Sequence, residues 1–186
     1  MTKAELASMV RTVLNEHGEE LSLSITSDNV KLDDYINRAL PDAVALLSVG
    51  GRWINATEHT PTISDGVFVL PEDFLSVIVL KLNDWKIPVT NITEVGTPEY
   101  RRAMNEFTAP GVHSPICLRA GDDEVKCLPA GECEMFIYNA MLGENLNGDD
   151  KACKAVAYMA AALVCSYFEE DNGKQRLSEL AMSFLV

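Results

Sequence analysis

Apolar side chains recur at helical spacing at the start of the chain. The spacing is that of one helix face, and its members are Leu6, Met9, Val10, Val13 and Leu14. Thr2 and Glu5 have the spacing of a capping box, in which each side chain bonds the backbone amide of the other residue. Gly18 is a typical helix end. The pattern therefore predicts a first helix that ends near Gly18.

A second helical pattern follows Ser27-Asp28. Its inward-facing positions are Leu32, Tyr35, Ile36, Ala39, Leu40, Ala43 and Leu47. Pro41 lies within the pattern, where it removes a backbone donor, so we expect a kink or a split in this helix. Gly50-Gly51 ends it.

The middle of the chain changes to β-branched runs and two-residue alternation, which are typical of strands. Strands are expected at 67–70, 75–82, 85–90, 116–119, 124–128 and 133–138. Asn83-Asp84 is the expected turn of a hairpin, and residues 52–66 are expected to form a loop. Because the connections are short, the strands are expected to pair antiparallel.

One short helix is expected inside this β-rich part. Thr97-Pro98 is a typical helix start, and the helix is expected to carry Tyr100, Met104 and Phe107 and to end before Pro110.

Two helices are predicted at the end of the chain. Asp149 is the expected cap of the first, which reaches about Glu170. One face of that helix carries Cys153, Val156, Ala157, Ala160, Val164 and Tyr167. The last apolar stripe consists of Leu177, Leu180, Ala181, Phe184 and Leu185 and runs to Val186.

The order of these elements predicts an α+β fold. We expect an antiparallel β-sheet or meander, with the N-terminal and C-terminal helices packed as a small bundle. The expected organisation is one domain over residues 1–186, with helices in 1–50, a β-module with one short helix in 65–140 and helices in 149–186. A chain of 186 residues is long enough to bury such a core.

Charge is the unusual feature of the composition. The formal net charge is −13, and a negative surface repels nucleic-acid phosphates and anionic lipid. The same acidity also keeps a protein soluble. Whether the charge serves to repel nucleic acid and lipid or only to maintain solubility stays open. The longest apolar stretch, 155–168, is shorter than the roughly 20 residues that span a bilayer. We therefore expect no membrane segment there.

Patterns of catalytic chemistry are missing from the sequence. It has no glycine-rich nucleotide loop, no phosphate-binding Gly-Lys loop and no Gly-x-Ser-x-Gly motif. Five cysteines form no Cys-x-x-Cys pair, and the three histidines are isolated. We expect no enzyme, and no catalytic, cofactor-binding or metal residue. Residues 144–150 offer oxygen ligands around Gly148 without EF-hand spacing, so either a solvated loop or a weak cation site fits them.

The apolar end of the chain is a candidate partner interface. A frayed end rich in Leu, Met and Phe would expose apolar groups to water, so the segment must dock. It either packs on its own domain or inserts into a partner. The candidate interface residues are Leu177, Leu180, Phe184, Leu185 and Val186.

An ordered series of short motifs occupies residues 65–140. The series consists of Leu70-Pro-Glu-Asp-Phe-Leu75, Trp85-Lys-Ile-Pro-Val89, Gly96-Thr-Pro-Glu-Tyr100 and Ser114-Pro-Ile116. This order resembles the head–tail adaptor proteins of tailed bacteriophages, which are also called connector or collar ring proteins. Each motif is short, and the resemblance rests on their succession.

The resemblance implies a structural virion protein. It implies a ring of identical subunits, commonly twelve, that binds the portal protein and the tail or a further collar ring. Genomic DNA would only pass through the channel. It also implies no cofactor, and a place at the head–tail junction after assembly in the host cytoplasm. The alternative function is a small cytosolic ligand-binding or regulatory module.

Overall fold

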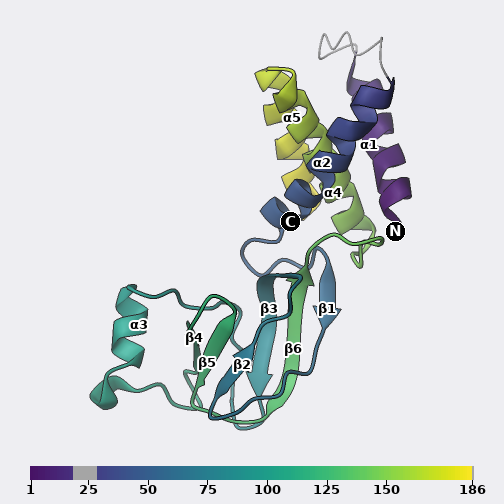
Figure 1. Cartoon of the computed structure of the whole chain (residues 1–186). Coiled ribbons are helices and arrows are strands. Elements are labelled where there is room, and N and C mark those ends of the chain that lie inside the picture. Colours follow the sequence, from purple (N-terminus) through teal and green to yellow (C-terminus); the bar gives the residue numbers. More distant parts are fainter. Residues whose placement is uncertain (19–28, 186) are drawn as a thin grey trace. The chain divides into compact units, whose positions relative to one another are not determined.

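A computed structural model describes residues 1–18 and 29–185 of the chain. The chain separates into two compact units: the helical unit, Met1–Asn55 with Met141–Val186, and the β unit, Ala56–Ala140. Helices and antiparallel strands are both present, so the predicted α+β fold class is confirmed (Figure 1). The single domain stays a prediction; the unit boundaries fall close to the expected segment limits.

The helical unit is built around one helix. Its four helices are α1 (Lys3–Gly18), α2 (Asn29–Leu47), α4 (Asp150–Tyr167) and α5 (Asp171–Ser183). Helix α4 contacts each of the other three. Its buried positions are largely alanine and cysteine, whose small side chains let neighbouring backbones approach closely. The predicted bundle of N-terminal and C-terminal helices is thereby confirmed.

The first helix begins and ends as the sequence predicts. The Glu5 amide donates to the Thr2 hydroxyl oxygen at 3.2 Å, and the Thr2 amide donates to the Glu5 carboxylate at 2.8 Å. This is the reciprocal bonding of a capping box. The inward stripe is buried at Leu6, Val10 and Val13.

Of the kink or split expected at Pro41, the split does not occur, and a kink stays a prediction. Helix α2 runs through Pro41 without interruption, since tertiary packing of a buried face outweighs one missing backbone bond. The buried face includes Ile36, Leu40 and Val44. Gly50 then adopts φ of +83°, a left-handed conformation that favours glycine, and the chain leaves the helix.

The β unit contains two three-stranded sheets. The strands are β1 (Ala56–Glu58), β2 (Val67–Val69), β3 (Phe74–Leu82), β4 (Ile116–Arg119), β5 (Glu124–Leu128) and β6 (Cys133–Ala140). The orders are β1-β6-β3 and β2-β5-β4, and all these pairs are antiparallel. Among these strands only β4 and β5 are both consecutive and paired, so the unit is not one simple meander.

Two local predictions in the β unit need correction. Residues 52–66 are not entirely a loop. Strand β1 lies among them and pairs with β6, the central strand of its sheet. Three residues are too few to show a period of two. Residues 85–90 do not form a strand: Leu80 and Val89 exchange backbone bonds at 2.8 Å as one isolated bridge, and Pro88 has no amide to extend it.

An aromatic cluster forms the core of the β unit. On β6, Phe136 and Tyr138 are buried and share one face of the strand. Their ring centroids lie 5.3 Å apart, and Phe68 meets Phe136 edge-on at 5.4 Å. The Tyr138 hydroxyl donates to an Asp73 carboxylate oxygen at 2.8 Å. Burial, followed by this carboxylate, raises the pKa of Tyr138 to about 12.

Alkaline conditions are expected to weaken the β unit through Tyr138. Its folded-state pKa is above its ordinary value of 10, so the native state holds the proton more tightly than the unfolded state. This stability is complete below about pH 10 and is lost as the pH rises toward 12, on the order of 2 kcal/mol. Urea unfolding at pH ~9 and pH ~12 should show a larger loss in the wild type than in Tyr138→Phe. Equal losses in the two proteins would contradict the prediction.

Candidate functional site

The C-terminal stripe packs largely within its own unit. Leu177 and Ala181 are fully buried, and α5 lies along α4. Leu180 is half-buried. The sequence left open whether this helix packs on its own unit or on a partner. Leu177 packs within its own unit, and its side chain does not reach the surface. Val186 lies outside the described residues. A partner interface at the remaining positions stays a prediction.

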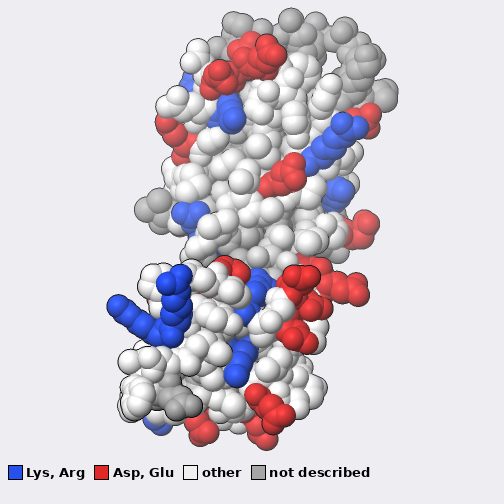
Figure 2. All heavy atoms as spheres, turned by 60° about the vertical axis from the view of Figure 1, so that its left-hand side comes forward, with Lys and Arg blue, Asp and Glu red and all other residues white. Residues whose placement is uncertain are grey.

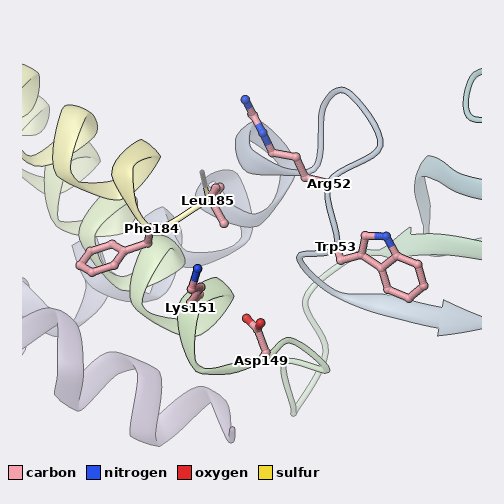
Figure 3. Close-up of a pocket in the computed structure, with 6 residues that line it drawn as sticks. All are labelled: Arg52, Trp53, Asp149, Lys151, Phe184 and Leu185. Carbon is pink, nitrogen blue, oxygen red and sulfur yellow. The ribbon is translucent and has the colours of Figure 1, made fainter.

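Phe184 and Leu185 line a surface hollow in the helical unit. The hollow has a volume of about 280 Å³, and its other lining residues are Arg52, Trp53, Asp149 and Lys151. Figure 3 shows Phe184 and Leu185 at the end of α5, Lys151 on the first turn of α4 and Trp53 turned away on the opposite side. Sequence reasoning missed Arg52, Trp53 and Lys151, because no periodicity links them to the C-terminal stripe.

Local bonds hold the walls of this hollow. The Asp149 carboxylate accepts from the Ala152 amide at 2.8 Å, which confirms the predicted helix cap. The Phe184 ring lies 5.2 Å from that of Tyr158 on α4. The Trp53 side chain, in contrast, is 57% exposed. The arrangement offers apolar surface beside two cations and one carboxylate, which is suited to binding.

The segment 144–150 is a structural connector and not a free loop. The Lys3 amide donates to the Glu144 carbonyl at 2.9 Å, and the Leu146 amide donates to the Met1 carbonyl at 2.8 Å. The Asn147 amide donates to the buried Asn55 side chain at 2.8 Å. Leu146 itself is buried. Most other residues of the segment are exposed and lie outside regular secondary structure, so the expected solvated loop before α4 is confirmed, with backbone bonds that anchor it.

A weak cation site in the same segment stays a prediction. The carboxylate of Asp149 already caps α4. Over residues 1–18 and 29–185, no three His, Cys, Asp or Glu residues come together as a metal site would require.

The length of the short helix in a projecting segment of the β unit differs from the prediction. It contains α3 (Pro98–Ala103) and the 3-10 turn η1 (Glu106–Thr108). The helix ends at Ala103, earlier than expected, so Met104 and Phe107 lie beyond it and are exposed. Phe107 is 96% exposed. Figure 1 shows α3 standing apart from the two sheets.

The segment that carries the first adaptor-like motif lines a second hollow. This hollow measures about 460 Å³ and lies in the link from β2 to β3. Leu70, Pro71 and Phe74 provide apolar surface, and Glu72 with Asp122 provides charge. The motif therefore contributes a concave surface as well as a strand start.

The cysteine thiols are poorly suited to nucleophilic chemistry. All five are free. The hydrogen bond between the Cys117 and Cys127 sulfurs, followed by burial, raises the pKa of Cys117. Burial raises the pKa of Cys133 and Cys153, and raises that of Cys165 to about 11. A thiol with a raised pKa is protonated at neutral pH, and the thiolate is the nucleophile.

The three histidines have different local surroundings. His17 approaches Tyr158 in the helical unit, with ring centroids 6.2 Å apart, whereas His59 approaches Phe136 in the β unit at 6.3 Å. His113 is exposed.

Helices in the described part of the chain are too short or too polar to cross a bilayer. No protein-family model matches the sequence, and a search of curated proteins also finds no match. The resemblance to head–tail adaptors therefore stays a prediction that rests on the four motifs.

Proposed function

We propose that this protein is a structural adaptor that forms a ring and connects the portal to the tail, or to the next collar ring, of a phage particle. The observation that carries the proposal is the exposure of large apolar side chains on both compact units. In the helical unit they include Leu46, Val49 and Trp53; in the β unit they include Val95, Met104 and Phe107.

Two unlike apolar surfaces suit a ring. A subunit in a cyclic ring meets its two neighbours through different surfaces, whereas a two-fold dimer uses one surface twice. Exposed apolar groups that recur within a short stretch favour a partner contact over water. The two sets lie in different units and have different sequences, as a head-to-tail contact requires.

The charge of the chain supports the same proposal. With a net charge of −13, an assembled ring would present DNA with like charge, which creates no binding well in which the genome would stick. In this role the subunits take part in no chemical step, need no cofactor and no membrane, and contact DNA only as it passes.

Electron microscopy of the purified protein, mixed with the portal protein encoded by the same genome, tests the proposal. The expected result is an added ring below the portal, with a central channel and about twelve subunits. The tagged protein should also copurify with particles. If it associates with neither portal nor particle, the proposal is wrong.

The hollow beside Phe184 supports the alternative of a ligand-binding module. Its apolar wall and the cations Arg52 and Lys151 would suit a small amphipathic anion. That function predicts a protein that does not join the portal and whose thermal midpoint rises with such a ligand.

A further inference from the structure

Phe107 is an exposed aromatic side chain on a locally ordered turn. The Asn105 side-chain oxygen accepts from the Phe107 amide at 2.9 Å, and the Thr108 hydroxyl donates to the Arg102 carbonyl at 2.6 Å. These bonds join η1 to the end of α3. An anchor that is ordered before binding loses little conformational freedom when a partner covers it.

The base of this projecting segment is attached to the sheet. The Thr93 amide donates to the Cys117 carbonyl at 2.8 Å, and the Arg119 amide donates to the Thr93 carbonyl at 3.0 Å. The Lys86 amide donates to the Val112 carbonyl at 2.8 Å. Residues 94–115, named the arm below, thus leave and rejoin the β unit at adjacent points.

The arm carries positive charge close to its apolar residues. Arg101 and Arg102 occupy the last turn of α3 and are exposed, as is the following Met104. Glu99 stands in the first turn. Glu106 adjoins Phe107 in the sequence, so the arm combines an apolar tip with two cations and is not uniformly basic.

The hollow between β2 and β3 has the complementary character. Its apolar part is formed by Val69, Leu70, Pro71, Phe74 and Leu75. Val69 is more than half exposed. With a volume of about 460 Å³, the hollow has room for one aromatic side chain.

Acidic groups surround this apolar surface. Glu72, Asp122 and Asp123 are exposed at the hollow, and Arg119 is the one cation in its lining. The Arg119 guanidinium lies 3.5 Å from a Glu94 carboxylate oxygen, which neutralises part of its charge. Carboxylates therefore dominate the rim.

Charges of opposite sign occupy different parts of the β unit. On the face shown in Figure 2, Lys and Arg side chains protrude at the left and middle of the lower half, and Asp and Glu side chains lie along its right and lower edges. Such a distribution favours contact between different parts of two copies.

We propose that Phe107 of one copy docks in the hollow of the next copy, with Arg101 and Arg102 facing its Glu72, Asp122 and Asp123. This inference rests on the proposed ring and identifies one contact within it. The contact is heterologous, since the arm and the hollow are different surfaces, and it leaves the pair with a free hollow on the first copy and a free arm on the second. Repetition around a closed rotation gives a ring.

Phe107→Ser is the first test. The side chain contributes nothing buried to its own subunit, so the variant should keep the circular dichroism spectrum and urea midpoint of the wild type. The fraction of subunits found in portal-bound rings should fall about tenfold. Met135→Ser, an exposed apolar side chain on β6, is the matched control and should assemble normally.

Charge reversal is the second test. Arg101→Glu with Arg102→Glu should weaken ring formation, as should Glu72→Lys with Asp122→Lys and Asp123→Lys. Combining all five substitutions in one chain makes the two surfaces complementary again and should restore rings. Normal rings from the Phe107→Ser variant, or no recovery in the combined and folded variant, would overturn the inference. If the wild type itself forms no ring with the portal, the proposed function fails and this inference falls with it.

Discussion

Replacing Trp85 by alanine should destabilise the β unit by about 4 kcal/mol, the largest effect we expect from a single substitution. The side chain is only 2% exposed and belongs to the core cluster of this unit, together with Leu80, Leu82 and Phe136. Removing the indole leaves a cavity that its neighbours cannot fill. It also leaves the Pro129 carbonyl, which accepts from the indole nitrogen at 2.9 Å, without that donor.

Urea unfolding followed by far-UV circular dichroism measures this effect. Trp53→Ala is the matched control, because its indole is exposed, and its free energy of unfolding should stay within about 0.5 kcal/mol of the wild type. Trp85→Phe should fall between the two, since the ring keeps most of the packing and loses the hydrogen bond. Similar stability of the two alanine variants would show that Trp85 does not hold the core.

The second large effect is expected at Gly148, just before the cap of α4. A Cβ atom at this position would lie 2.4 Å from the Ile54 carbonyl oxygen and 2.8 Å from the Ala152 Cβ. The Ile54 carbonyl belongs to the backbone and the Ala152 Cβ is attached directly to it. Neither atom can move aside by a side-chain rotation. Gly148→Ala should therefore force a backbone shift at the start of α4 and destabilise the helical unit by about 3 kcal/mol.

Gly143→Ala is the control for this substitution. It lies in the same connecting segment, and a Cβ atom there would meet nothing within 4 Å. Its thermal midpoint should match that of the wild type, whereas Gly148→Ala should unfold at a clearly lower temperature in the helical signal. Equal thermal midpoints for the two variants would contradict this prediction. They would mean that the backbone around residue 148 can shift to accept a Cβ atom at little cost.

The sequence predicted those elements whose pattern is long and local. The capping box of α1 and the Asp149 cap of α4 depend on residues a few positions apart, and the structure confirms them. These features depend on hydrogen bonds and side-chain directions that secondary structure alone determines.

Features that depend on distant residues were not predictable in this way. Strand β1 exists because β6, far along the chain, pairs with it. The exposure of Phe107 depends on where α3 ends, and a stripe of Tyr100, Met104 and Phe107 looks the same whether it faces a core or water. The hollow beside Phe184 joins α5 to residues 52–53 and 149–151, and no sequence spacing relates these segments.

The division of the chain also has a consequence for biosynthesis. The helical unit consists of Met1–Asn55 and Met141–Val186, and the whole β unit is encoded between them. During translation α1 and α2 leave the ribosome first, yet α4, which contacts every other helix of their unit, is made only after the β unit is complete. The β unit can therefore fold while its own chain is still growing, whereas the faces of α1 and α2 that pack against α4 stay uncovered until α4 has been made.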